Sequence, residues 1–310
     1  MAERVAPSAL ARELQGGRFV VTAELTPPVS TMLDGLIAQA QRLKGLAVAV
    51  NVTDGAGAKT HLSSLVASGM LARNGVEPIL QITCRDRNRL AIQADLLGAA
   101  AMGIRNVLVL GGDDPRAGDQ PDTKPVFDLS SGTLLAMAHA MRRERKLPSG
   151  TPIGGDFDLV LGAADMPVDP PPDWHPKSLI AKADAGADFV QTQFCMDAGI
   201  VRRYAGRLLD LGIAQRVPVL IGVCPIPSAR SARWMREKLM GTIIPDHFIE
   251  RLEKAADPRA EGMRLCADFM RELGQIPGIA GAHVMAPVNP SAVPDVIAQS
   301  GMTGQPRARC

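Results

Sequence analysis

The feature that most constrains the fold of this sequence is an alternation, repeated eight times, between short apolar runs and segments with helical spacing. Each apolar run has the length and the aliphatic, β-branched content of a strand that is buried on both faces. Between the runs, apolar side chains recur every three or four residues, which predicts helices, including one long helix over 246–273. The predicted strands cover residues 19–25, 46–52, 78–84, 105–112, 159–164, 188–194, 217–223 and 279–285.

Strict alternation of strand and helix requires a parallel sheet with right-handed crossovers. Eight such units in 310 residues close most economically into a single (β/α)8 TIM barrel of the α/β class, which we place at residues 19–300. Residues 1–18 are expected to form a lead-in helix, and residues 301–310 a disordered C-terminal tail. A doubly wound nucleotide-binding sheet is disfavoured, because no GxGxxG follows the first strand and no P-loop sequence occurs.

Composition excludes several classes of function. A net charge of +2 without long basic runs, and 3% aromatic residues, give neither an electrostatic footprint nor a stacking surface for nucleic acid. The five cysteines are scattered, without a CxxC pair or a Cys/His cluster, so we expect reduced thiols and no metal site. No apolar run is long enough to span a membrane and the N-terminus lacks a signal peptide, so we expect a cytoplasmic protein without a membrane partner.

Polar residues gather where the predicted strands end, which is where a barrel of this type builds its active site. Gly111 and Gly112 end the fourth strand, where the absence of Cβ atoms would let a flat ligand approach the backbone. Other residues at or near strand ends are Glu24, Thr53, Asp54, Gln81, Thr83, Asp113, Asp165, Gln193 and His283.

Each of these positions also has a structural interpretation. Glu24 favours function, because apolar neighbours disfavour the charged form of a carboxyl, as a general acid requires. Gln191 and Gln193 share one strand face and need partners, and function is favoured for Gln193 nearer the mouth. His283 is equally well interpreted as a hydrogen-bonded core residue or a catalytic one. Gln81 and Thr83 can belong to a polar interior layer, and Asp54 can cap a turn.

Several of these strand-end motifs, in their order along the chain, resemble those of the 5,10-methylenetetrahydrofolate reductase family. The resemblance covers nearly the whole chain, and it is specific because the motifs fall on successive predicted strands. It lies in AELTPP at 23–28, NVTDGAG at 51–57, QITC at 81–84, LGGD at 110–113, DAGAD at 184–188, TQF at 192–194, GVCPI at 222–226, IPD at 244–246, DP at 257–258, EG at 261–262 and GAHVM at 281–285.

The resemblance implies an oxidoreductase that interconverts 5,10-methylenetetrahydrofolate and 5-methyltetrahydrofolate, with NADH or NADPH as hydride donor and FAD in the barrel. Glu24 resembles the general acid, and Asp113 resembles the aspartate near flavin and pterin. Folate would be bound by Gln193, Asp113, Thr26, His283 and Arg230. The cofactor would be bound by Thr53, Asp54, Gln81, Thr83, Gly111, Gly112, Ala163, Asp165, Ser178 and Lys182.

The sequence departs from the family pattern mainly in residues expected near flavin. Gly111 stands where an arginine is common, Gln81 stands where histidine is frequent, and Lys182 is the phosphate partner that remains on the helix over 176–185. These departures leave open direct hydride transfer from NADH without flavin. A methyltetrahydrofolate-binding barrel that transfers a methyl group and a non-catalytic barrel subunit are further alternatives, and association into a homo-oligomer is left open.

Overall fold

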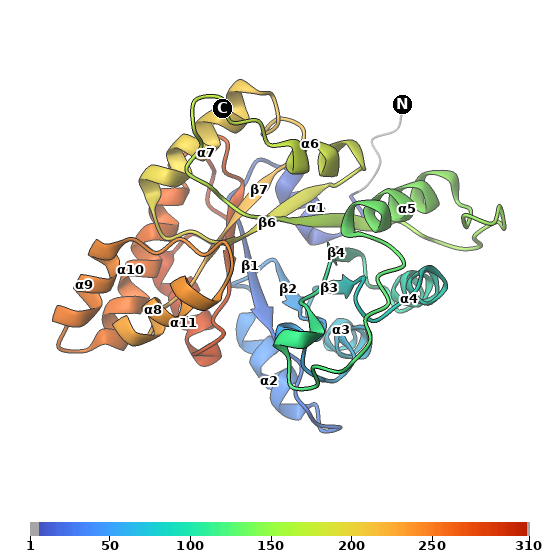
Figure 1. Cartoon of the computed structure of the whole chain (residues 1–310), viewed down its shortest axis with the longest axis horizontal. Helices are drawn as coiled ribbons and strands as arrows, with labels where there is room; N and C mark the ends of the chain where they lie inside the picture. Colours follow the sequence, from blue (N-terminus) through green and yellow to red (C-terminus); the bar gives the residue numbers. More distant parts are fainter. Residues whose placement is uncertain (1–5, 309–310) are drawn as a thin grey trace.

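The eight predicted strands form a closed barrel. The computed structural model describes residues 6–308, and in it each strand pairs in parallel with the next, while β8 pairs with β1 (Figure 1). The predicted (β/α)8 barrel is therefore confirmed. The strands are β1 (Val20–Leu25), β2 (Ala49–Val52), β3 (Pro78–Thr83), β4 (Asn106–Leu110), β5 (Val160–Asp165), β6 (Phe189–Phe194), β7 (Val219–Val223) and β8 (Gly281–Val284).

Helices surround the barrel, and many begin at a residue whose side chain caps free backbone N–H groups. Asn88, for example, accepts hydrogen bonds from the backbone N–H groups of Leu90 and Ala91. The main helices are α1 (Ala9–Gln15), α2 (Asp34–Leu43), α3 (Ser64–Arg73), α4 (Arg89–Ala101), α5 (Ser131–Glu144), α6 (Lys177–Asp184), α7 (Ala198–Asp210), α8 (Ala229–Lys238), α9 (Asp246–Lys254), α10 (Pro258–Leu273) and α11 (Val293–Ser300).

The prediction of one helix over 246–273 is wrong, because the segment divides into α9 and α10. The residue before a proline is pushed out of the helical region, and Asp257 has φ −126° and ψ 94°. Its carboxylate accepts hydrogen bonds from the N–H groups of Arg259 and Ala260, so a new helix begins at Pro258.

Both ends of the described chain close the N-terminal end of the barrel. Leu10 and Leu14 of α1 pack on the first inward residues of the strands, and Glu77 accepts hydrogen bonds from the N–H groups of Ala9 and Leu10 at 2.8 and 2.9 Å. The expectation of a disordered tail is wrong for residues 301–308, because Gln305 accepts a hydrogen bond from the Phe19 N–H group at 2.8 Å. Residues 1–5 of the predicted lead-in helix, and 309–310, lie outside the described residues.

The interior of the barrel is layered. Apolar side chains, among them Ile79, Leu108, Phe189 and Leu220, fill the end nearest α1. The Phe189 ring occupies the space that a Cβ atom at Gly162 would need, so the glycine on β5 makes room for the aromatic residue on β6. Above this layer the interior becomes polar, and this change positions the candidate site.

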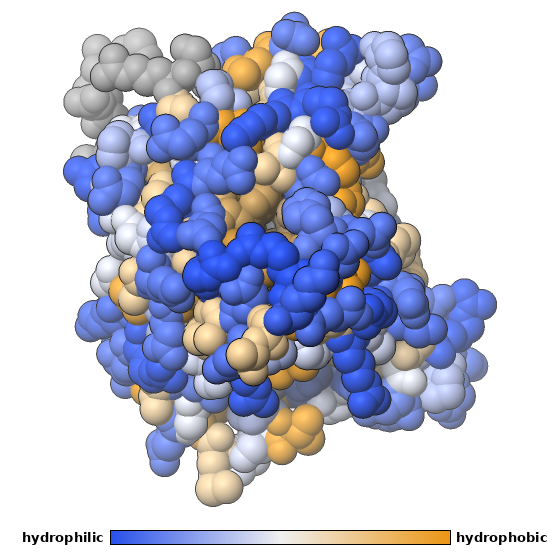
Figure 2. Space-filling view, turned by 90° about the vertical axis from the view of Figure 1, so that its left-hand side faces the viewer, coloured by the Kyte–Doolittle hydropathy of each residue, from blue (hydrophilic) through white to orange (hydrophobic). Residues whose placement is uncertain are grey.

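The outer surface contrasts with this interior. On the face shown in Figure 2, hydrophilic residues predominate and apolar residues lie between them in small groups. None of the helices within residues 6–308 is long and apolar enough to cross a membrane.

Candidate active site

Glu24 lies at the C-terminal end of β1, where its side chain is 22% exposed. Its Oε2 atom accepts a hydrogen bond from Gln81 Nε2 at 3.0 Å and lies 3.6 Å from His283 Nε2. The carboxyl is therefore accessible from solvent and held by polar groups from β3 and β8. This is an arrangement in which a carboxylic acid can deliver a proton to a bound molecule.

A polar layer lies within the barrel next to Glu24. His283 Nδ1 lies 2.9 Å from Thr22 Oγ1, which also accepts a hydrogen bond from Gln191 Nε2 at 2.9 Å. Gln191 and Asn51 exchange two amide hydrogen bonds, of 2.7 and 3.1 Å. The interpretation of His283 as a hydrogen-bonded core residue is confirmed. Its side chain is only 3% exposed, and direct binding of substrate by His283 stays a prediction.

Gln193 lies at an irregularity of β6, where the register with β7 shifts between Gln191 and Phe194. Gly222 on β7 permits the irregularity, since a Cβ atom there would collide with the Gln193 backbone. The Gln193 Oε1 atom accepts a hydrogen bond from the Phe194 N–H group at 3.0 Å, and within residues 6–308 its Nε2 group has no partner. Irregularities of this kind change the direction of side chains near active sites. Because its Nε2 group is unpartnered, the half-buried Gln193 amide is free to bind a ligand.

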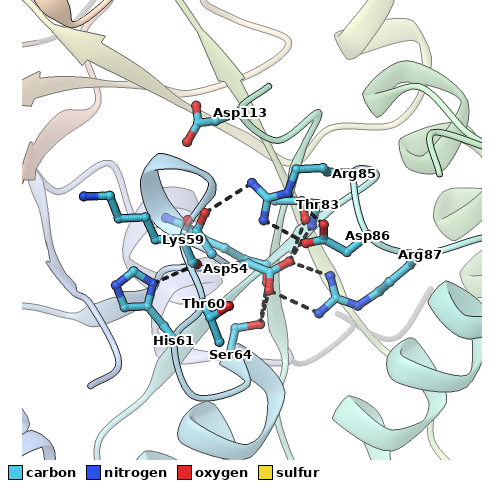
Figure 3. A network of polar contacts seen from close by, with 12 residues as sticks. Asp54, Lys59, Thr60, His61, Ser64, Thr83, Arg85, Asp86, Arg87 and Asp113 are labelled. Atoms are coloured by element: carbon cyan, nitrogen blue, oxygen red, sulfur yellow. Dashed lines mark hydrogen bonds and ion pairs between the residues drawn. The ribbon is translucent and has the colours of Figure 1, made fainter. Parts of the chain in front are cut away.

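Asp54 is the centre of a buried network between β2 and β3 (Figure 3). Its carboxylate accepts hydrogen bonds from Arg87 at 2.6 and 3.1 Å, from the Thr83 N–H and hydroxyl groups at 2.9 Å each, and from the Ser64 hydroxyl at 3.1 Å. Burial by itself would raise the pKa of Asp54, but the hydrogen bonds and charge of Arg87, together with Thr83, outweigh burial and lower it.

This network bears on two predicted cofactor contacts. The Asp54 carboxylate accepts five hydrogen bonds from protein groups, whereas the Thr83 hydroxyl donates to Asp54 and its oxygen can still accept. Cofactor binding by Asp54 and Thr83 stays a prediction. Two residues outside the predicted set, Arg85 and Arg87, hold the loops after β2 and β3 together. Arg85 donates to Gly55 O at 3.2 Å and to Asp86 at 2.7 and 2.8 Å. The RDR sequence directly after a buried strand was the available signal.

Asp113 lies in the loop after β4, which crosses over the loop after β2. Its Oδ2 atom accepts a hydrogen bond from the Gly57 N–H group at 2.8 Å, and Gln120 donates to Thr60 at 3.2 Å. Figure 3 shows the Asp113 carboxylate apart from the Asp54 network. Asp113 is exposed and does not contact Glu24, so the structure places the two predicted catalytic carboxyls at separate points of the mouth.

A pocket of about 60 Å³ opens between the ends of β4 and β5, and Gly111, Ala163 and Lys182 line it. Lys182 Nζ donates to Ala164 O at 2.6 Å and lies 3.4 Å from Asp165 Oδ1. Asp165 Oδ2 accepts a hydrogen bond from Tyr204 at 2.8 Å. Burial raises the pKa of Tyr204, and the Asp165 charge adds to this effect, so the phenol stays protonated and donates.

The remaining predicted residues differ in environment. Gly112 has φ 95°, and a Cβ atom there would lie 3.1 Å from Thr83 Cβ, so the turn requires glycine. The Thr53 hydroxyl is buried without a hydrogen-bond partner among the described residues, which leaves it available to a ligand. Thr26, Ser178 and Arg230 are exposed on three different elements and are not brought together.

The methylenetetrahydrofolate reductase family model matches residues 9–301. A Caenorhabditis elegans probable methylenetetrahydrofolate reductase (NADPH) is 31% identical over 69% of this chain and 31% of its own length. A Pectobacterium carotovorum 5,10-methylenetetrahydrofolate reductase is 29% identical over 69% of this chain and 66% of its own. The chain thus spans less than two thirds of either relative.

A solved structure supports the same fold. A Clostridium thermocellum protein, described as binding two copies of 5-methyl-5,6,7,8-tetrahydrofolic acid, superposes with a TM-score of 0.63. The alignment covers 94% of this chain and 97% of that one at 15% identity, so it shows a shared barrel. Since the family model matches nearly all of the chain, the chain belongs to the methylenetetrahydrofolate reductase family.

Proposed function

We propose that this chain interconverts 5,10-methylenetetrahydrofolate and 5-methyltetrahydrofolate, with a reduced nicotinamide nucleotide as hydride donor. The observation that carries the proposal is the Glu24 carboxyl, which is partly exposed at the barrel mouth and fixed by Gln81 and His283. Family membership supports the substrate class. The nucleotide in the name of the Caenorhabditis elegans relative, NADPH, supports the donor.

The reaction assigns a distinct role to Glu24. Protonation of the folate N10 amine by Glu24 breaks the bond between N10 and the bridging methylene carbon, which leaves an N5 iminium ion. Hydride from the nicotinamide ring then reduces that carbon to the N5 methyl group, and the nucleotide is oxidised. In this scheme the Asp113 carboxylate stabilises the cationic iminium, and the free Gln193 amide binds the pterin ring.

FAD, which the family resemblance implies, fits these residues poorly. Gly111 and Ala163 line a pocket of only about 60 Å³. Lys182 is the predicted partner for the FAD diphosphate, and its ammonium is already compensated by Ala164 O and the Asp165 carboxylate. We therefore propose direct transfer from the nicotinamide to the folate.

The first experiment is a visible absorption spectrum of the purified protein before and after incubation with FAD and desalting. Direct transfer predicts a colourless protein that oxidises NADH or NADPH when methylenetetrahydrofolate is added. A flavin band that survives desalting would contradict direct transfer while leaving the reductase proposal intact. Methyltetrahydrofolate binding without nucleotide oxidation would instead favour a methyltransferase-like barrel.

The second experiment replaces the proposed acid. Glu24→Gln removes the proton and keeps the shape, so folate-dependent nucleotide oxidation should fall by about 10²–10⁴-fold. Glu144→Gln, the same change on the outer helix α5, is the matched control and should leave the rate unchanged. Wild-type turnover in the Glu24 variant would show that another group delivers the proton.

A further inference from the structure

The His283 imidazole is buried against Glu24 and has polar partners at both ring nitrogens. Nε2 lies 3.6 Å from Glu24 Oε2, whereas Nδ1 lies 2.9 Å from Thr22 Oγ1 and 3.3 Å from Gln191 Nε2. Which nitrogen carries the hydrogen of a neutral imidazole is set by such partners. The polar layer therefore determines whether His283 Nε2 carries a hydrogen or a lone pair on the side that faces Glu24.

The side-chain amides of Asn51 and Gln191 fix which group donates in each hydrogen bond of this layer. Asn51 Nδ2 donates to Gln191 Oε1 at 2.7 Å, which leaves Gln191 Nε2 to donate to Asn51 Oδ1 and to Thr22 Oγ1. The Thr22 hydroxyl accepts from Gln191, and its own hydrogen is directed to its other partner, His283 Nδ1. His283 Nδ1 thus accepts, and the ring hydrogen lies on Nε2, facing Glu24.

The two oxygens of Glu24 consequently differ. Oε2 faces two N–H groups, Gln81 Nε2 at 3.0 Å and His283 Nε2 at 3.6 Å. Within residues 6–308, Oε1 has no hydrogen-bond partner. Oε2 accepts a hydrogen bond from Gln81 Nε2 and has the His283 Nε2–H group within 3.6 Å, so it is the carbonyl oxygen of a protonated carboxyl, and the transferable proton lies on Oε1.

We propose that His283 is a positioning residue for Glu24. Its Nε2–H group, oriented by Gln191 and Thr22, holds Oε2 so that Oε1 presents the proton, and it stabilises the carboxylate that remains after the proton has left. This inference rests on the proposed function, because it assigns His283 a part in the same proton transfer. Among residues 6–308, His283 is the titratable side chain that contacts Glu24.

The tautomer can be measured without turnover. In ¹⁵N-histidine-labelled protein above about pH 8, where an ordinary histidine is neutral, the ring nitrogens of the five histidines are resolved by NMR. The resonance missing from His283→Gln identifies His283. We expect a hydrogen-bearing Nε2 and a bare Nδ1. A hydrogen on Nδ1 would overturn the proposal, and this test stands even if the protein does not reduce folate.

Kinetics test the positioning role. His283→Leu removes the N–H group that faces the Glu24 carboxylate at 3.6 Å, and it should lower kcat about tenfold, with KM for the folate nearly unchanged. The alkaline limb of the kcat profile should move to higher pH, since a carboxylate with one donor fewer holds its proton more tightly.

His283→Gln places an amide N–H near the Nε2 position and should recover most of the rate. His247→Leu, on the exposed side of α9, is the control and should behave as wild type. Wild-type kcat and an unchanged pH profile in His283→Leu would refute the proposal. If His283→Leu fails to fold, two measurements still test the proposal. They are the rate and pH profile of His283→Gln and the tautomer of His283 in the wild-type protein.

Discussion

Replacing Asp54 by Asn tests whether the buried network between β2 and β3 stabilises the barrel. The Asp54 and Arg87 side chains are only 7% and 18% exposed, so the change leaves a largely desolvated guanidinium without its closest carboxylate. Breaking a buried ion pair in this way costs about 3–5 kcal/mol. Because Arg87 keeps Asp95 at 2.8 Å, we expect the lower end, about 3 kcal/mol.

The free energy of unfolding is measured by urea denaturation followed by far-ultraviolet circular dichroism. The matched control is Asp114→Asn, which alters an ion pair with Arg116 whose side chains are 47% and 83% exposed, and which should leave the midpoint unchanged. Adding Arg87→Met to Asp54→Asn should recover part of the loss, since it removes the uncompensated cation. An Asp54→Asn variant within about 1 kcal/mol of wild type would refute the reasoning.

Four further predictions concern pH, packing and thiol chemistry. The pKa of Asp54 is lowered in the folded state, so its contribution to stability is present above the unfolded pKa of about 3.9 and is lost as pH falls through the folded value. Acid unfolding followed by circular dichroism should accordingly be less steep for Asp54→Asn, and an identical profile would contradict this. Leu10→Ala should cost about 3 kcal/mol in urea denaturation, because it opens a cavity between α1 and the barrel, whereas Leu211→Ala at a partly exposed site should cost much less. Gly162→Ala should lower the melting temperature by crowding the Phe189 ring, and a second change, Phe189→Leu, should restore part of it. Burial raises the pKa of Cys84 to about 11 and of Cys195 to about 12, and also raises the pKa of Cys224 and Cys266, so peptide mapping of the native protein after iodoacetamide at pH 8 should find these four unlabelled.

Much of the fold could be predicted because its signals are local. Apolar runs with helical segments between them identify strands and helices within windows of about a dozen residues. Their alternation leaves few topologies besides the barrel. The division between α9 and α10 was also present locally, in Asp257 and Pro258, but the helical spacing on both sides obscured it.

The candidate site was only partly predictable. Position at a strand end singled out Glu24 and Gln193, which the structure places at the barrel mouth, because the mouth of a barrel follows from topology. The same criterion also selected Asp54 and Thr83. The Asp54 carboxylate accepts hydrogen bonds from the Thr83 hydroxyl and from Arg87. Whether a polar side chain is free or saturated depends on partners from other loops, which a single strand does not reveal.

The sequence by itself determined that eight strands alternate with helices and that several of them end in glycines, amides or carboxyls, since side-chain alternation and strand length are properties of neighbouring residues. Only the tertiary structure decided that Asn51 orients Gln191, 140 positions away, and that Thr22 links Gln191 to His283 beside Glu24. Barrel closure and strand register bring these four strands together, and hydrogen-bond direction is fixed only when every partner is in place.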